Sequence, residues 1–409
     1  MSAAHAGHTS QLDLLPTDAN GSAPLATHVA VNHGDWFDPA TWADGEIPGD
    51  GALVHIPQGV AVSYEGDSDA ALFIVRVDGA LGFHAEDGIA TRMVVDTLLT
   101  APGSHLTIDA GSEISGTVDV VFAEGRPAAH ATHYTTGTPG DGVLGRSGWD
   151  PEQLSLGLIA GGEVEITGQH VQSGLQLAEA PMAGASELIF ATDIATSGWA
   201  PGQKIAIGGT QFLGRDPDGS LISQDEVREI VAVRVEDGRM IVTLDQPLDH
   251  DHSGTTHPKT GEVLTGHVAN LSRNVTFSSK AADPDGDGIP QAGHSVGQTL
   301  APDDHYVTER GHIMFMHNDD ISVVNAAFHG LGRTDKTRPV DDFQTGGLRN
   351  NRLIQDQGEI GVYEPDIDTT LETAAEQITN QRGRYALHIH EARGSTPTAT
   401  TIPTPRPTR

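Results

Sequence analysis

The chain has 409 residues and a formal net charge of −33, because 23 Lys and Arg face 56 Asp and Glu. Nucleic-acid-binding proteins carry basic surfaces, so this balance argues against that class and favours solubility or bound divalent cations. Cysteine is absent, which excludes disulfide bonds, thiolate metal sites and cysteine nucleophiles.

Short β-branched runs bounded by Gly, Asp and Pro follow a small, polar lead at residues 1–27. Such runs indicate strands. Gly59, Gly79 and Gly103 each begin one of them, 20 and 24 residues apart. This spacing favours a solenoid in which each coil adds one strand to each wall. An antiparallel sandwich with similar strand spacing is the alternative.

The middle of the chain changes character. Alternating valines before "EDGR" and the run "MIVTL" after it predict a β-hairpin with Asp-Gly in its turn. We expect an inserted small β-barrel-like module here. The predicted organisation has five parts: a flexible lead (1–27), the first coils (28–175), the inserted module (176–266), further coils with the candidate site (267–394), and a disordered Thr/Pro-rich tail (395–409).

Three stretches within residues 34–111 share a recognisable pattern: "GDWFDPATWADGEIPGDGALVHIPQGVAV", "LFIVRVDGALGF" and "APGSHLTIDAG". They resemble the G-eight domain, a module named for its eight glycines. The later stretches "VTLDQPLDHDH", "VANLSRNVTF", "RGHIMFMH", "NAAFHGLGRTDK" and "GRYALHIH" occur in the same order in bacterial G-eight proteins. They also resemble the family of the animal cell-migration-inducing hyaluronan-binding protein and the cell-surface hyaluronidase. The resemblance spans residues 28–394.

This resemblance implies an all-β fold, a right-handed parallel β-helix. It also implies an extracellular role in binding or cutting polysaccharide, with hyaluronan as the animal ligand. The family continues with further coils after the position of "GRYALHIH", whereas this sequence ends within 20 residues, in "STPTATTIPTPRPTR". We therefore expect a bacterial member that is truncated at its C-terminus.

Cationic and imidazole side chains gather late in the sequence, since 11 of the 23 Lys and Arg lie in residues 301–409. Successive side chains of a strand point to opposite faces. For "GRYALHIHE" we expect solvent-facing side chains at Arg384, Ala386, His388 and His390, and interior side chains at Tyr385, Leu387 and Ile389. Neighbouring coils would add polar side chains at His317, Asp319, Asp320, His329, Arg333, Asp335 and Lys336.

One chemistry that this cluster could support is β-elimination on a uronic acid. The reaction needs a cation to neutralise the carboxylate, a base for the C5 proton and an acid for the leaving oxygen. Arg333 or Arg384 could neutralise, His388 or His317 could be the base, and Tyr385 could be the acid.

Two other chemistries and a non-catalytic role remain open. Hydrolysis by a carboxylate pair would draw on candidates that include Asp319, Asp320, Asp335 and Glu391. A metal site would use three imidazoles with an open position, from His317, His388 and His390. Alternatively, these polar residues form ladders that satisfy backbone groups in turns. The chain would then be a carbohydrate-binding or adhesion module.

The loop "DPDGDGIP" suggests calcium. Asp283, Asp285 and Asp287, with Gly288 next, match the first half of a calcium-binding loop. Position twelve is His294 instead of Glu, so an EF-hand is not expected, and a solvated loop is the alternative. Calcium is one cofactor that the sequence suggests, beside the divalent metal of the His317/His388/His390 hypothesis.

The resemblance thus implies an extracellular or cell-surface protein that recognises or degrades a uronate-containing polysaccharide. The expected partner is a glycosaminoglycan-like polyanion, not nucleic acid. No run of 18 apolar residues occurs, so no membrane span is predicted. The N-terminus lacks the basic and apolar regions of a signal peptide. Because the chain is so acidic, polyanion binding requires a local basic patch or bound calcium.

Overall fold

Strands make up almost every element whose bounds are described, which confirms the predicted all-β class. The computed structural model describes residues 26–85, 88–111, 116–123, 155–191, 197–217, 219, 221–283, 291, 293–294, 305, 307–316, 320–337 and 384–390. Among these described residues, three single-turn 3-10 helices accompany the strands: η2 (Pro39–Thr41), η4 (Lys280–Ala282) and η5 (Val307–Glu309).

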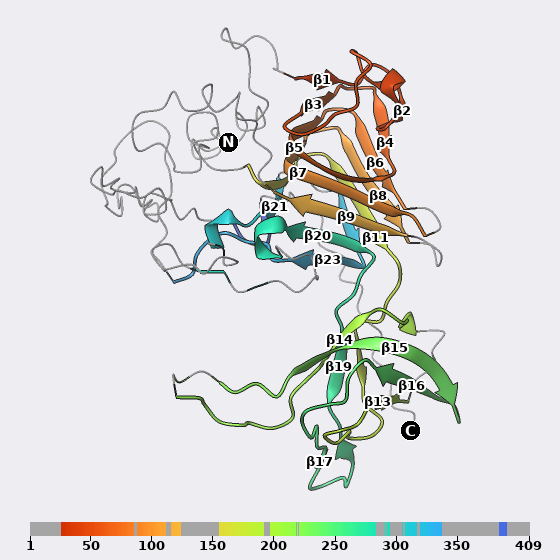
Figure 1. Ribbon diagram of the computed structural model, residues 1–409, viewed down its shortest axis with the longest axis vertical. Coiled ribbons are helices and arrows are strands. Elements are labelled where there is room, and N and C mark those ends of the chain that lie inside the picture. Colours follow the sequence, from red (N-terminus) through yellow and green to blue (C-terminus); the bar gives the residue numbers. More distant parts are fainter. Residues whose placement is uncertain are drawn as a thin grey trace, which may run out of the picture.

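A parallel sheet of six strands forms one face of the upper part of the molecule (Figure 1). We call it stack C. In order across the sheet it contains β2 (Gly34–Asp35), β4 (Ala61–Tyr64), β6 (Ala80–His84), β8 (His105–Ala110), β11 (Glu163–Gly168) and β22 (Ile321–Val324). The strands predicted after Gly59, Gly79 and Gly103 are β4, β6 and β8, and they are direct neighbours.

A second parallel sheet has ten strands and divides into two stacks, because β5 (Asp67–Val77) and β7 (Ala90–Thr100) are long enough to serve both. Stack A contains the first halves of these two strands, then β9 (Thr117–Phe122), β20 (Val275–Ser279) and β23 (Ala326–His329). Stack B contains β1 (His28–Val29), β3 (Leu53–Ile56), the second halves of β5 and β7, β10 (Gly157–Ala160), β21 (His312–Met316) and β24 (Leu387–His390).

From β4 onward the chain visits the stacks in one repeated order, C then A then B. The third of these turns is β8, β9 and β10. The next is β11, β20 and β21, and the last is β22, β23 and β24. Each strand lies beside the equivalent strand of the previous turn, so a turn buries its apolar side chains against its neighbours alone.

The interior between the stacks is apolar and continuous. An aromatic row runs through stack A, where the Phe277 ring stacks on Phe122 at 6.4 Å and on Phe328 at 5.6 Å between centroids. At the N-terminal end, Trp36 and Trp42 close the interior. Their rings lie 5.0 Å apart, and the indole N–H of Trp42 donates to the Trp36 carbonyl at 2.8 Å. Both side chains are buried, so this end of the stacks is capped.

A separate antiparallel sheet is formed by residues between β11 and β20 and lies at the lower end of Figure 1. Its order is β12 (Gly174–Gln176), β19 (His267–Asn270), β14 (Lys204–Ile207), β15 (Glu226–Glu236), β16 (Arg239–Leu244) and β13 (Glu187–Phe190), with β17 (Thr255–Thr256) and β18 (Val263–Leu264) as a small extra pair. The predicted hairpin is confirmed: β15 and β16 pair, and Asp237 and Gly238 adopt φ of 51° and 74°.

The later turns have long connections between stack A and stack B. In β5 and β7 the chain passes from stack A to stack B within one strand. After β9, β20 and β23 the stack B strands β10, β21 and β24 instead begin many residues later. Since the strands on either side of these connections are stacked, the described residues that flank them lie close together. We call this position the A/B corner, with described residues 155–157, 310–312, 332–337 and 384–386.

Candidate functional site

The A/B corner is built on a backbone turn at Leu156, which adopts a φ of 62°. A positive φ is strained for a leucine and persists only where the surroundings enforce it. Here the Leu156 N–H donates to Asp96 Oδ1 at 3.1 Å and to Thr97 Oγ1 at 3.0 Å. Its carbonyl accepts from Arg333 Nη1 at 3.1 Å and lies 3.0 Å from His312 Nδ1. A carbonyl only accepts, so His312 carries a proton on Nδ1.

Segments far apart in the sequence are joined above this turn. The Arg384 carbonyl accepts the Arg333 N–H at 2.9 Å and the Thr334 N–H at 3.2 Å. The Arg384 N–H in turn donates to Thr334 Oγ1 at 3.1 Å. Gly332 makes the close approach possible: its φ is 96°, and a Cβ there would lie 2.8 Å from the Ala386 nitrogen.

The charged side chains of this clamp are buried. Arg333, Asp335 and Arg384 are 4%, 3% and 6% exposed. Asp335 Oδ1 accepts hydrogen bonds from the Thr337 N–H at 2.9 Å and the Thr337 hydroxyl at 2.7 Å. Because buried charges are costly unless hydrogen-bonded, these groups serve first to fix the corner. The expectation that Arg384 faces solvent is wrong, since its contacts with residue 334 draw it inward.

Lys336 and Tyr385 directly follow the buried Asp335 and Arg384 in the sequence and belong to an accessible group of side chains. Lys336 Nζ sits 4.1 Å from the centroid of the Tyr385 ring, a cation–π contact. The Tyr385 and His388 rings are 5.7 Å apart, centroid to centroid. Lys336 and Tyr385 are exposed and His388 is half-buried. We call Lys336, Tyr385 and His388 the surface triad. It combines a cation, a phenol and an imidazole on one outer surface.

The register of β24 agrees with the predicted interior face for two of the three side chains assigned to it. Leu387 and Ile389 align with Ile313 and Phe315, which belong to the interior, so the predicted alternation is borne out for them. They are nevertheless 37% and 57% exposed. Tyr385 precedes the strand and is 39% exposed, so it does not face the interior as predicted.

The remaining predicted site residues are not brought to the surface triad. Asp320 is exposed and precedes β22, at the other end of β21 from the A/B corner, where its carbonyl accepts the Val164 N–H. Asp283 follows η4, and its N–H donates to the Lys280 carbonyl. The backbone of His390 pairs with Met316. Outside the described residues are His317, Asp319, Asp285, Asp287, Gly288, Glu391 and the side chain of His390.

Metal ligands are not grouped in the part of the chain that the structure describes. Within it, no three His, Asp or Glu side chains stand close enough to hold a metal ion together. Asp283 is the one member of the calcium hypothesis that is described, and the hypothesis stays a prediction.

A second polar group, on the outer face of stack A, was not predicted. Asp119 accepts a hydrogen bond from the Thr276 hydroxyl. Burial raises the pKa of the Asp119 carboxyl, although this hydrogen bond and the charge of Arg92 both act to lower it. His329 lies two strands away from Asp119. Burial lowers the pKa of the His329 imidazole, although the negative charges of Asp283 and Asp119 act to raise it. A signal was present in the sequence, since Asp119 interrupts the otherwise apolar alternation of "TVDVVF".

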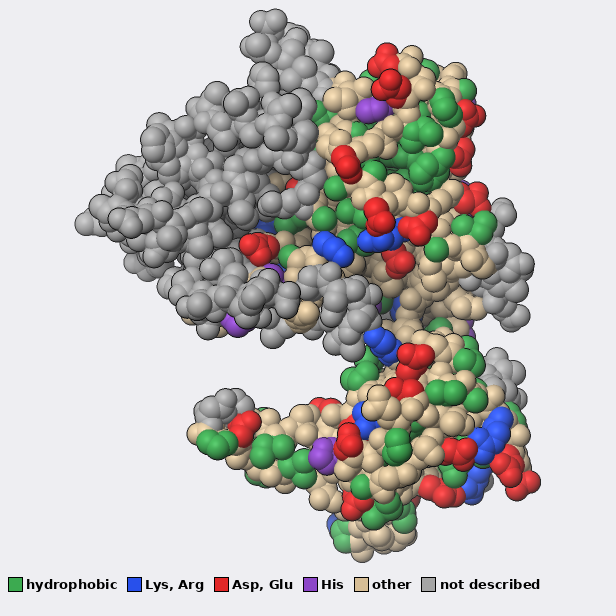
Figure 2. Space-filling view, viewed as in Figure 1, with side chains coloured by type: hydrophobic (Ala, Val, Ile, Leu, Met, Phe, Trp, Pro, Cys, Tyr) green, Lys and Arg blue, Asp and Glu red, His purple; other side chains and the backbone are tan. Residues whose placement is uncertain are grey.

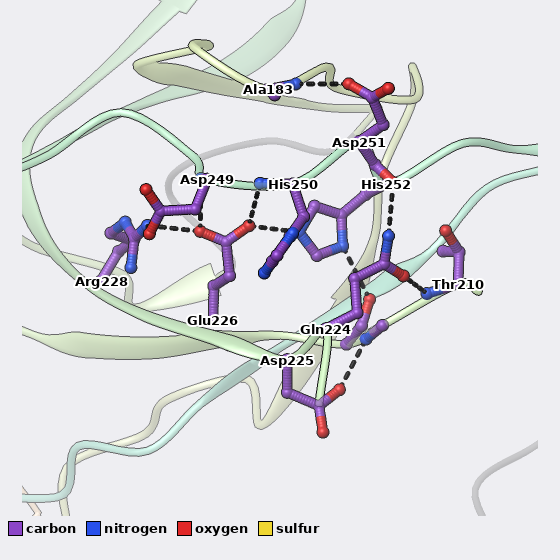
Figure 3. A network of polar contacts seen from close by, with 12 residues as sticks. Ala183, Thr210, Gln224, Asp225, Glu226, Arg228, Asp249, His250, Asp251 and His252 are labelled. Carbon is purple, nitrogen blue, oxygen red and sulfur yellow. Dashed lines mark hydrogen bonds and ion pairs between the residues drawn. The ribbon is translucent and has the colours of Figure 1, made fainter. Parts of the chain in front are cut away.

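A third polar group lies in the antiparallel sheet (Figure 3). The buried Glu226 carboxylate accepts from the backbone N–H groups of Asp249 at 2.8 Å and His250 at 2.9 Å, and from Arg228. The buried His252 ring faces it, with Nε2 3.0 Å from Glu226 Oε1 and Nδ1 3.0 Å from the Gly208 carbonyl. Both partners are acceptors, so each contact calls for a proton on the ring nitrogen that faces it. This network fixes the base of the loop at residues 209–225.

Comparison with known proteins adds no assignment. No protein-family model matches this chain, and no curated protein matches it. Among the described residues, no helix is long and apolar enough to cross a membrane.

Proposed function

We propose that this chain is a right-handed parallel β-helix that binds a uronate-containing polysaccharide at the surface triad. The observation that carries the proposal is the triad itself: Lys336, Tyr385 and His388 are in contact, reach the outer surface, and stand on a rigid base of buried charges. The repeated order of parallel strands supports the β-helix, and the resemblance to G-eight proteins supports the class of ligand and an extracellular location.

Electrostatics favour the triad over other surfaces for an anionic ligand. The chain carries a net charge of −33, and acidic side chains outnumber Lys and Arg over the described face in Figure 2. A polyanion is repelled by such a surface at low salt. Lys336 offers a local positive charge, and Tyr385 offers an aromatic face beside it. We therefore expect moderate salt to help approach and high salt to weaken the final contact.

The chemistry that the triad supports best is β-elimination. Lys336 would neutralise the uronate carboxylate, which acidifies the C5 proton. His388 would take that proton, the C4–O bond would break as the C4=C5 double bond forms, and Tyr385 would give its proton to the leaving oxygen. Lys336 replaces the neutralising arginine of our sequence-based hypothesis, because Arg333 and Arg384 are buried.

The proposal is tested by incubating the chain with hyaluronan, chondroitin and alginate. Elimination creates an unsaturated uronate, so ultraviolet absorbance should rise as chains shorten. Binding is measured in parallel by isothermal titration calorimetry. Lys336→Ala should weaken binding at least 10-fold. His388→Ala should abolish the absorbance signal but retain binding.

The matched control is Lys259→Ala, which removes an exposed lysine from the antiparallel sheet region and should change neither signal. Binding that is retained without any product would favour a non-catalytic carbohydrate-binding module. Absence of both binding and product for all three polysaccharides would refute the proposed ligand class.

A further inference from the structure

Two outward-facing side chains lie side by side on neighbouring strands of stack A: Ser278 on β20 and His329 on β23. In the register of these strands Phe277 pairs with Phe328, and Ser278 pairs with His329. The two phenylalanine rings stack against the interior, with 5.6 Å between their centroids. Because successive side chains of a strand point to opposite faces, Ser278 and His329 both point out of the stack.

The spacing of the two strands brings the hydroxyl and the imidazole within reach of each other. Neighbouring strands lie about 4.8 Å apart, so the β-carbons of an in-register pair on one face are about 5 Å apart. A hydrogen bond of about 3 Å spans this separation once the Ser278 hydroxyl takes the matching staggered rotamer. Both side chains are half-buried and keep some contact with solvent. A hydroxyl beside an imidazole is the arrangement that activates serine as a nucleophile.

The surroundings of His329 suit a general base. Burial lowers the pKa of its imidazole, which keeps the ring neutral and able to accept a proton near neutral pH. The negative charges of Asp283 and Asp119 act in the opposite sense, so they stabilise the imidazolium once a proton arrives. Asp283 follows the same strand as Ser278, because η4 turns the chain there and the Asp283 N–H donates to the Lys280 carbonyl.

The row that carries Ser278 and His329 continues as apolar surface on the next two strands. Ser278 pairs with Val121 of β9, and Val121 pairs with Val94 of β7. By the same alternation both valines lie on the outer face, yet they are only 8% and 6% exposed. A covered apolar floor beside a hydroxyl fits a short acyl group such as acetyl, and it disfavours a charged group.

The adjoining row distinguishes Ser278 from the other outward hydroxyl of β20. Thr276 donates its hydroxyl proton to Asp119 in a hydrogen bond. Its in-register partner on β23 is Ala327, which offers no base. Of these two hydroxyls, Ser278 is therefore the one with an imidazole beside it.

We propose that Ser278 and His329 are the nucleophile and the base of a second site, which hydrolyses short-chain acyl esters. The Ser278 oxygen attacks the ester carbonyl carbon and its proton passes to His329. The bond from this carbon to the alcohol oxygen then breaks, and His329 gives its proton to that oxygen. Water next attacks the acyl-serine and loses a proton to His329. The carboxylic acid leaves as His329 returns the proton to the Ser278 oxygen.

The first test is hydrolysis of p-nitrophenyl acetate by the full chain, together with covalent labelling by a fluorophosphonate, which reacts with activated serines. This site is separate from the surface triad, so the test is independent of polysaccharide binding. Mass spectrometry should place the label on Ser278. Ser278→Ala should lose both signals, and His329→Gln should slow both at least about 100-fold. Ser322→Ala, at an exposed serine of stack C, is the matched control and should change neither.

A second measurement needs no ester. The chain has no cysteine, so Ser278→Cys introduces a single thiol. A thiol beside an imidazole ionises more readily and reacts faster with iodoacetamide. Adding His329→Gln to Ser278→Cys should slow this reaction at least about 10-fold near neutral pH, whereas adding it to Ser322→Cys should not. An equal rate with and without His329→Gln would overturn the proposal, as would p-nitrophenyl acetate hydrolysis that persists in Ser278→Ala.

Discussion

Replacing Glu226 with glutamine should destabilise the antiparallel sheet sharply. The Glu226 carboxylate is almost fully buried and holds Arg228, the His252 ring and two backbone N–H groups. Glutamine keeps the shape and one acceptor oxygen but removes the charge. Breaking a buried ion pair costs about 3–5 kcal/mol. Because glutamine still accepts from part of the donor set, we expect a loss of about 3 kcal/mol.

Hydrogen exchange measures this loss locally. A loss of about 3 kcal/mol speeds the exchange of β14, β15 and β16 amides roughly 100-fold, if these amides open with the sheet. Exchange in β6 and β8 should stay unchanged, since those strands belong to a separate core. The control is Glu187→Gln, which removes an exposed partner of Arg234 and should cost less than about 0.5 kcal/mol.

The same substitution should remove part of the acid sensitivity of this sheet. Burial alone would raise the Glu226 pKa, but hydrogen bonds from Asp249, His252 and His250 and the charge of Arg228 outweigh it. The pKa therefore lies below its ordinary 4.5. A lowered carboxyl pKa contributes stability above the unfolded-state value, and this stability is lost as the pH falls through the folded-state value. If Glu226→Gln and wild type exchange equally fast at neutral pH, the reasoning is refuted.

Two further substitutions test the parallel stacks. Gly332→Ala should loosen the clamp between residues 332–334 and β24, because the new Cβ would meet the Ala386 nitrogen at 2.8 Å and the backbone φ there is strained for alanine. The expected result is faster hydrogen exchange confined to the amides of β24. Unchanged exchange there would contradict the reasoning. Phe277→Ala should cost about 3–5 kcal/mol in denaturant unfolding, because a fully buried ring stacked on Phe122 and Phe328 is lost. A cost below about 1 kcal/mol would show that the aromatic row does not stabilise the stack.

Local signals in the sequence predicted the elements well. The Asp-Gly turn between β15 and β16 requires two residues of positive φ, which Asp and Gly tolerate, so neighbouring residues determine it. The strands after Gly59, Gly79 and Gly103 were likewise predictable, because each follows a turn and alternates apolar side chains.

Properties that depend on stacking were not predictable from local patterns. Alternation placed Arg384 toward solvent, but contacts with Thr334, fifty residues away in sequence, draw it inward. Asp119 and Thr276 are 157 residues apart in the sequence and meet only because β9 and β20 stack as neighbours. The strained turn at Leu156 also depends on Asp96 and Thr97 from an earlier turn, and nothing in its own neighbourhood indicates it.

The capped end of the stacks has a consequence for folding during synthesis. The turn closed by Trp36 and Trp42 leaves the ribosome first, and each later strand needs only the preceding turn as its template. The exception is the edge of β11, because its partner in the next turn, β22, follows roughly 150 residues later. At about 5–20 residues per second, that edge waits about 8–30 s while the antiparallel sheet, β20 and β21 are made. Nascent chains should therefore be most vulnerable to mispairing in this interval, and a chaperone bound there would protect the growing stack.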